Sequence, residues 1–283
     1  MSVGAGRSCY LNGDFLPLNE ARVSVLDRGF IFGDAVYEVI IAQGGRIFAL
    51  EEHLERLTNS LNAVLLDNPL TAGEWQAMLQ RLVDVNSGGG QTIYVQVTRG
   101  VAERDHAFPR GVAPTVFAMC RPLSVADGLA RVGAVVLPDN RWLRCDIKST
   151  SLLPNILLRN QAIAAGAYEA ILVRDGFITE GSASNVFVVH GDCVRTAPLS
   201  AQILPGVSRA LLIDVLRGND VTVEEEPVPV ASLGDADEVW LTSTTRDLVA
   251  VTSIDGVMVG SGESPLAERA FREFQLYKAF RLR

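Results

Sequence analysis

The chain has 283 residues, of which 48% are apolar and 20% are charged, and its formal net charge at pH 7 is −8. This length exceeds what one core usually supports and suggests two domains, while the composition is that of a soluble globular protein. The acidic balance argues against general binding of nucleic acid or anionic membranes, which needs a basic face. No apolar run approaches the ~20 residues that cross a bilayer, and the start lacks a signal-peptide pattern, so we expect a cytoplasmic protein.

Cysteine and histidine are too sparse for a metal site. The cysteines are far apart and show no CxxC pairing, so we expect buried small hydrophobic residues rather than disulfides or zinc ligands. Only His53, His106 and His190 are available, which cannot assemble a histidine-rich metal centre. We therefore expect no bound metal.

The first part of the chain alternates strand and helix signals. Asn12-Gly13 and Gly44-Gly45 each stand between two strand-like runs, and both dipeptides indicate β-hairpins. Leucines recur at helical spacing over 50–65, which predicts an amphipathic helix with one packed face. The further expected elements are a helix at 71–86 and strands at 91–100 and 114–120.

The pattern breaks into turn residues near 121–129, where we place the domain junction. The predicted domains are 1–121 and 129–283, with a linker at 122–128 between them. In the second domain, strands are expected at 130–138, 144–148, 168–174, 185–189, 221–225 and 237–242, and helices at 155–167 and 207–218. Strands outnumber helices, and a turn at 174–176 between the third and fourth strands favours antiparallel pairing, so the fold class is α+β.

Lys148 is one of only two lysines in a chain that otherwise carries its positive charge on arginine; the other is Lys278. In a strand over 144–148, alternation would place Arg144, Asp146 and Lys148 on one face. A buried lysine loses its proton readily, and the neutral amine can act as a base or form an imine with an aldehyde, which arginine cannot do at neutral pH. The alternative is a surface lysine at the end of a strand.

Two further segments suit a phosphorylated heterocycle, although each also has an ordinary structural explanation. After a hairpin strand, Glu180 precedes a run of small polar residues, and a carboxylate there can keep a pyridine nitrogen protonated; a surface turn explains the same residues. Pro205-Gly206 begins a predicted helix with Ser208 in its first turn, which is either a phosphate site or a plain N-terminus. The same choice applies to the hydroxyl residues that follow a buried strand, Ser243, Thr244 and Thr245.

A loop after a strand holds Arg104 and His106 two residues apart, where both can point at a carboxylate. Polar loop residues are more often only solvated. The roles of Arg56 on the first long helix and Tyr37 on a strand are also undecided at this point, since each residue is either structural or a ligand contact.

Taken together, these segments resemble the fold-type IV pyridoxal-phosphate aminotransferases, a family that includes branched-chain aminotransferases, D-amino-acid aminotransferases and aminodeoxychorismate lyase. The matching motifs cover nearly the whole chain in order: NGDF, RGFIFGDAVYEV, HLERL, YVQVTRG, DIKS, YEAIL, EGSASNVF, ILPGVSR and LTSTT. The resemblance implies a homodimer that binds pyridoxal 5'-phosphate (PLP). It also implies a small N-terminal α/β domain and a larger C-terminal, mostly antiparallel β domain with helices, with the cofactor between the two.

By this resemblance, Lys148 is the lysine that forms a Schiff base with PLP, and Glu180 is the partner of its pyridine nitrogen. Leu204 matches the residue that packs against the cofactor ring. The positions that match the family's phosphate site are Arg56, Val207, Ser208 and Thr244, and Ser243 is a further expected cofactor-binding residue. The positions expected to support these groups from behind are Ser149, Glu169 and Ser184.

Within the family, RWLRCDIKS and ERDHAFP are most similar to D-amino-acid aminotransferases, where Tyr37, Arg104 and His106 match the residues that bind the substrate carboxylate. The implied reaction moves the amino group of a D-amino acid such as D-alanine to a 2-oxo acid in a ping-pong sequence. One departure is Ala183, where the family pattern has serine. Alternatives are an L-branched-chain or (R)-amine transaminase, aminodeoxychorismate lyase, and, without a cofactor, a lysine aldolase or a binding protein.

Overall fold

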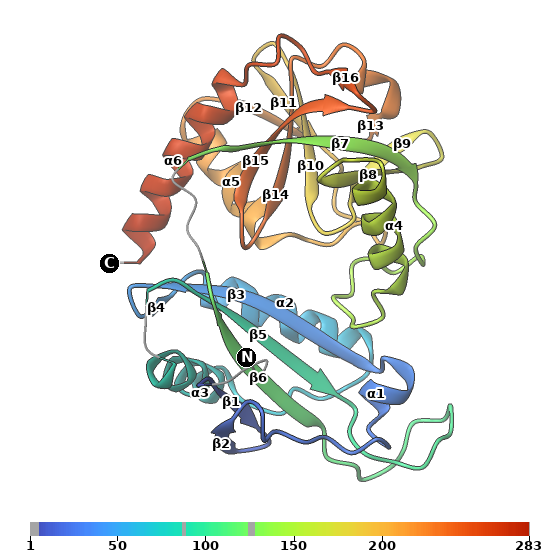
Figure 1. Ribbon diagram of the computed structural model, residues 1–283, viewed down its shortest axis with the longest axis vertical. Helices are drawn as coiled ribbons and strands as arrows, with labels where there is room; N and C mark the ends of the chain where they lie inside the picture. Colours follow the sequence, from blue (N-terminus) through green and yellow to red (C-terminus); the bar gives the residue numbers. More distant parts are fainter. Residues whose placement is uncertain (1–5, 87–88, 124–127, 283) are drawn as a thin grey trace. The chain divides into compact units, whose positions relative to one another are not determined.

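The computed structural model describes residues 6–86, 89–123 and 128–282. They divide into two compact units. The first contains the described residues up to 123 together with Ile147–Ser151, and the second contains those of Ala126–Asp146 and Leu152–Arg281 (Figure 1). Of the predicted linker at 122–128, residues 124–127 lie outside the described residues.

The first unit is built on an antiparallel sheet with the strand order β2-β1-β6-β5-β3-β4. Its strands are β1 (Ser8–Leu11), β2 (Asp14–Pro17), β3 (Ala35–Gln43), β4 (Arg46–Ile47), β5 (Gln91–Thr98) and β6 (Thr115–Pro122). Both predicted hairpins are confirmed. Asn12 and Gly13 join β1 to β2 with φ of 50° and 108°, and Gly44-Gly45 joins β3 to β4 with φ of 57° and 78°. Such turns match the twist of the strands that they connect.

Three helices complete this unit: α1 (Arg28–Phe32), α2 (Leu50–Ala63) and α3 (Ala72–Val85). The two predicted helices are confirmed; α2 packs on β3, and α3 packs on β1 and β6. Leu57 and Leu61 from α2 and Leu79 and Leu82 from α3 are buried in one core with Ile93 of β5. These buried leucines fix the place of each helix on the sheet, although the buried face of α2 also holds His53, Arg56 and Ser60.

The segment Ile147–Ser151 lies along the edge of β3. The Tyr37 amide donates to the carbonyl of Lys148 at 2.9 Å, the Thr150 amide donates to the carbonyl of Ala35 at 3.0 Å, and Val36 and Ser149 form an isolated antiparallel bridge. The strand predicted over 144–148 is wrong, because within the described residues 141–150 this bridge is the only β-pairing. Five alternating residues do not determine a strand when their backbone groups find other partners.

The second unit contains a ten-stranded sheet with the order β12-β11-β10-β14-β15-β7-β8-β9-β13, and β16 pairs with β15. The pairs β11–β12, β15–β7 and β7–β8 are parallel and the others are antiparallel, so the prediction of a mostly antiparallel α+β fold is confirmed. Its strands are β7 (Ala130–Pro138), β8 (Glu169–Arg174), β9 (Phe177–Gly181), β10 (Asn185–His190), β11 (Cys193–Thr196), β12 (Thr222–Glu225), β13 (Val228–Pro229), β14 (Glu238–Ser243), β15 (Asp247–Ile254) and β16 (Val257–Met258).

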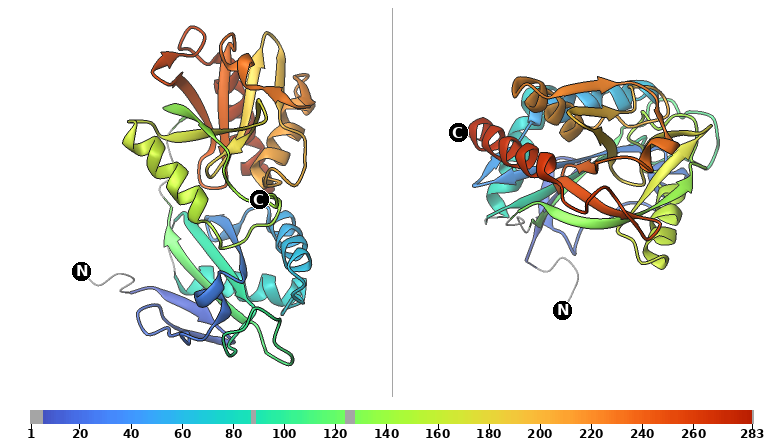
Figure 2. Two further views of the ribbon diagram at one scale, coloured as in Figure 1. Left: turned by 90° about the vertical axis from the view of Figure 1, so that its right-hand side faces the viewer. Right: turned by 90° about the horizontal axis from the view of Figure 1, so that it is seen from above.

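The helices of this unit are α4 (Leu153–Ala164), α5 (Val207–Gly218) and α6 (Pro265–Arg281), with a short 3-10 helix at Val230–Leu233. The predicted helices α4 and α5 are confirmed. Figure 2 shows α4 beside β7 and β8, on which it packs, while α6 packs on β14, β15 and α5. Lys278 of α6 is buried and forms an ion pair with Asp247 at 2.7 Å. No helix among the described residues is both long and apolar enough to span a membrane.

Candidate active site

Lys148 is held in the first unit by its own backbone. Besides its carbonyl bond to the amide of Tyr37, its amide donates to Oγ of Ser60 in α2 at 3.2 Å. Because Lys148 and Tyr37 face each other across the edge of β3, their side chains leave on the same side, and the Lys148 Nζ lies 4.3 Å from the centre of the Tyr37 ring. Two of the predicted site residues therefore lie together.

Behind this pair, Arg56 belongs to a buried ionic group. The Glu38 carboxylate accepts from Nε and Nη2 of Arg56 at 2.7 and 2.8 Å, and its Oε2 lies 2.9 Å from Nδ1 of His53. Burial alone would raise the pKa of Glu38, but Arg56 and His53 outweigh it and hold the pKa well below its usual range. Burial also lowers the pKa of His53, and the positive charges of Arg56 and Lys148 act in the same direction. The group is thus an ionised Glu38–Arg56 pair with a neutral histidine.

Arg104 and His106 lie on an exposed loop and are brought together by an aromatic ring. The Arg104 guanidinium carbon is 5.3 Å from the centre of the Phe32 ring, and the His106 ring is 5.6 Å from the same ring. The loop is tied down by Arg28, whose Nη1 donates to the carbonyl of Asp105 at 2.5 Å. Tyr37, the third residue predicted to bind the carboxylate, stacks on Tyr94 with ring centres 5.7 Å apart.

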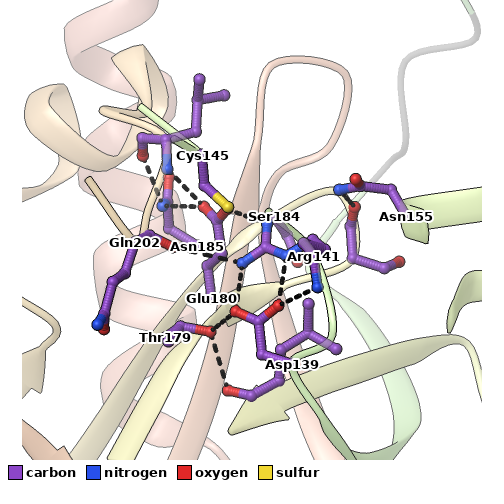
Figure 3. Close-up of polar contacts among 12 residues, drawn as sticks. Asp139, Arg141, Cys145, Asn155, Thr179, Glu180, Ser184, Asn185 and Gln202 are labelled. Carbon is purple, nitrogen blue, oxygen red and sulfur yellow. Dashed lines mark hydrogen bonds and ion pairs between the residues drawn. The ribbon is translucent and has the colours of Figure 1, made fainter. Parts of the chain in front are cut away.

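In the second unit, Glu180 lies within β9, and not after a hairpin strand as predicted, because the turn at 174–176 joins β8 to β9. Its carboxylate has partners on both oxygens (Figure 3). Oε2 accepts from the amide of Leu204 at 2.9 Å and from Nδ2 of Asn185 at 3.2 Å, and Oε1 accepts from Nη1 of Arg141. Burial raises the pKa of Glu180 to about 7, although Arg141 opposes the shift.

The predicted phosphate residues of this unit gather at two chain turns. Val207 and Ser208 are the first residues of α5, and both are buried. Among the described residues, no side chain caps this helix, so its first N–H groups are not satisfied by a capping side chain. Ser243 ends β14, and Thr244 begins the turn after it; both are half-buried.

Glu169, a predicted supporting residue, lies at the start of β8 and is buried. Its Oε2 accepts from Oγ of Ser184 at 3.0 Å, and its Oε1 accepts from the hydroxyl of Ser182. The prediction thus names two residues, Glu169 and Ser184, that contact each other. Ser149, the third supporting residue, belongs to the first unit and pairs with Val36 of β3.

Several residues that contact these groups are missing from the sequence-based prediction, among them Glu38, His53, Asp139 and Arg141. Glu38 lies in the same strand as Tyr37, and His53 lies in the same helix as Arg56. The periodicity of each element places Glu38 and His53 on its buried face, and this periodicity is the sequence signal that could have revealed them. Arg141 stands in RWLRCDIKS, but the motif does not say what it contacts. For Asp139 the sequence holds no such signal.

Comparison with known proteins agrees with the motifs. Residues 35–254 match the model of the family described as amino-transferase class IV. The chain is 41% identical to a D-alanine aminotransferase of Bacillus licheniformis over 253 residues, which are 89% of each protein, and 38% identical to one of Staphylococcus haemolyticus over 93% of this chain and 95% of that protein. Its fold is similar to a branched-chain aminotransferase of Thermoproteus uzoniensis, solved with norvaline, with a TM-score of 0.88 and 25% identity over 97% of this chain and 95% of the other. The chain belongs to the class IV aminotransferases, as the motifs predicted.

Proposed function

We propose that this protein is a PLP-dependent D-amino-acid aminotransferase of the D-alanine type, which transfers the amino group to a 2-oxo acid. The observation that carries this proposal is the identity of 41% and 38% to two proteins named D-alanine aminotransferase, over nearly their whole length. A homodimer in the cytoplasm, with a small domain at 1–121 and a larger cofactor-binding domain at 129–283, is part of the same proposal.

The residues of the second unit fit PLP. A Cβ added at Gly206 would lie 2.0 Å from Oδ1 of Asn185, so the backbone that leads into α5 must approach Asn185 closely. Among the described residues, no side chain caps the first N–H groups of α5. The hydroxyl of Thr242, the ladder partner of Asn185, is buried and has no hydrogen-bond partner among the described residues. Bare N–H groups and an unsatisfied hydroxyl suit phosphate oxygens, and the carboxylate of Glu180 suits a ring nitrogen.

When bound, PLP supplies an aldehyde that bonds covalently to an amine and a ring that withdraws electrons from the substrate Cα. In our proposal, the phosphate is bound by Arg56, the start of α5, Ser243 and Thr244. Glu180 would accept a hydrogen bond from the protonated ring nitrogen, and Leu204 would pack on the ring. Glu169, Ser149 and Ser184 support the residues that would bind the cofactor.

Lys148 has two tasks in this proposal. Its amine would hold the cofactor, and in the reaction the same amine would take the proton from the substrate Cα and later return one. The ring of Tyr37, 4.3 Å from Nζ, limits where that amine can point. One base on one side reaches the Cα proton of one enantiomer only, once Tyr37, Arg104 and His106 have fixed the carboxylate.

A half-reaction tests the substrate class. D-Alanine and then L-leucine are added to the holoenzyme without an acceptor, and the visible absorbance of the bound cofactor is followed. We expect D-alanine to bleach the band and L-leucine to leave it. Bleaching by L-leucine alone would replace our proposal with an L-branched-chain aminotransferase, and a protein without a visible band would not be a PLP enzyme.

A substitution tests the amine. Lys148→Arg keeps the charge but cannot bond to an aldehyde, so we expect a folded protein without the visible band and with nearly no turnover. Lys278→Arg is the matched control, because it changes the only other lysine and keeps the charge beside Asp247. If Lys148→Arg kept the band and Lys278→Arg lost it, the assignment of the reactive lysine would be wrong.

A further inference from the structure

Arg141 stands between two buried carboxylates. Its Nε and Nη2 donate to the two oxygens of Asp139 at 2.9 and 2.8 Å, and its Nη1 donates to Oε1 of Glu180 (Figure 3). The side chains of Arg141 and Asp139 are 3% and 0% exposed. Since a guanidinium presents its donors in a fixed plane, two bonds to Asp139 determine where the third donor points.

Asp139 is held in turn from the sheet behind it. Oγ1 of Thr179 in β9 donates to its Oδ2 at 2.9 Å, and Nη2 of Arg174 in β8 lies 3.1 Å from its Oδ1. Burial would raise the pKa of Asp139, but Arg141 and Thr179 outweigh it and lower the pKa, so Asp139 is ionised. With Glu180 ionised as well, two carboxylates balance the two guanidinium groups of Arg141 and Arg174. A protonated Glu180 would leave one buried positive charge without its counterpart.

Glu180 depends on this arrangement for its charge. Its carboxylate is nearly inaccessible to water, which raises its pKa to about 7, and Arg141 is the largest influence in the opposite direction. The amide of Leu204 also favours the ionised form but carries no full charge. Removal of Arg141 would therefore raise the pKa of Glu180 further and leave its Oε1 without the contact to Nη1 that orients the carboxylate.

We propose that Arg141, braced by Asp139, is a positioning residue that fixes the orientation of Glu180 and keeps its carboxylate ionised for a protonated ring nitrogen. This inference rests on the proposed function, because it assumes that Glu180 meets the ring nitrogen of PLP. It adds that the Glu180 carboxylate is prepared by the fold before the cofactor arrives, because each of its partners belongs to the second unit itself.

The test measures the dissociation constant of PLP for the apoenzyme by quenching of tryptophan fluorescence, at pH values from 6 to 9. Arg141→Gln removes both the positive charge and the planar set of guanidinium donors, whereas Arg141→Lys keeps only the positive charge. Arg144→Gln is the matched control, since Arg144 is an exposed arginine that pairs only with its own neighbour Asp146 at 2.9 Å among the described residues. Circular dichroism of each apoenzyme shows whether the variant is folded.

We expect Arg141→Gln to weaken PLP binding by about 10–100-fold, as losses of supporting partners behind a ligand group do. Arg141→Lys weakens it less, and Arg144→Gln leaves it within about 2-fold. In a Glu180→Gln background the effect of Arg141→Gln should fall below about 3-fold, because the two residues act through one contact. The pH at which affinity changes should rise in Arg141→Gln and be absent in Glu180→Gln.

Three results would overturn the inference. If Arg141→Gln weakened PLP binding equally in the wild-type and the Glu180→Gln backgrounds, Arg141 would stabilise the fold and would not act through Glu180. If it bound PLP like the wild type, Arg141 would have no role toward the cofactor, while the proposed function would stand. If the wild-type apoenzyme failed to bind PLP at all, the proposed function itself would fail. Should Arg141→Gln not fold, Arg141→Lys and Asp139→Asn, each in both backgrounds, decide the question by the same comparison.

Discussion

The substitution Glu38→Gln tests the buried ionic group of the first unit. Glu38 is fully buried, and its carboxylate receives both Nε and Nη2 of Arg56 at 2.7 and 2.8 Å as well as a contact of 2.9 Å with His53. Glutamine keeps the volume but removes the negative charge, so the buried guanidinium of Arg56 loses the charge of Glu38 beside it. Breaking a buried pair in this way costs about 3–5 kcal/mol of unfolding free energy. At roughly 2–4 °C per kcal/mol, the melting temperature should fall by about 10 °C.

The measurement is differential scanning calorimetry of the apoenzyme at pH 7.5, with Asp146→Asn as the control. Asp146 forms the same type of pair with Arg144, but the two side chains are 32% and 48% exposed, so its loss should cost less than about 1 kcal/mol. Equal shifts of melting temperature in the two variants would refute the reasoning from burial. The pKa of Glu38 is depressed in the folded state, so its contribution is present above the unfolded value of 4.5 and is lost as the pH falls further. The difference between wild type and Glu38→Gln should therefore narrow below pH 4.5.

Three other predictions concern separate parts of the chain. Burial lowers the pKa of His53, so wild-type stability should decline as the pH falls below 6.5, by up to ~1.4 kcal/mol per pH unit, and urea titrations of His53→Asn should lack this decline. Gly206→Ala should displace Asn185 and weaken PLP binding by roughly 10-fold in a fluorescence titration, whereas Gly218→Ala, with open space around its Cβ, should not. Arg104→Lys should raise the KM for D-alanine by at least about 10-fold through loss of the two-pronged grip, with an unchanged melting temperature; unchanged D-alanine turnover in Arg104→Ala would contradict the carboxylate role.

The elements that were predictable from sequence are those with strong local signals. Asn12-Gly13 fixes a hairpin through backbone preferences of two residues, and the leucines of α2 fix a helix through one repeated face. The strand β9 was expected only as a hairpin strand that ends before Glu180, and β11, β15 and α6 are among the elements that were missed. The segment 144–148 was misassigned because its backbone is satisfied by distant partners, such as the carbonyl of Ala201, which accepts from the amide of Cys145 at 2.8 Å.

The candidate site divides in the same way. Lys148 stood out because the chain has only two lysines, and Glu180 was assigned by the resemblance to the family, which the comparisons confirmed. Arg141 and Asp139 did not, since an arginine and an aspartate two residues apart usually form an exposed pair. Only the pairing of β8 with β9 brings Thr179 and Glu180 up to them and makes the contact a buried one. Such contacts between distant parts of the chain are not encoded in any short motif.

The scarcity of lysine, with Lys278 buried in its ion pair with Asp247, has a practical consequence for peptide mapping. The chain has two lysines, so a lysine-specific endoproteinase can cut it only after 148 and 278. Lys278 is buried and held at 2.7 Å by its partner, whereas Lys148 is half-buried. After borohydride treatment of the loaded enzyme and denaturation, a blocked amine at Lys148 removes one of the two cuts and leaves the other. The reactive lysine can then be identified from the mass of a single undivided peptide.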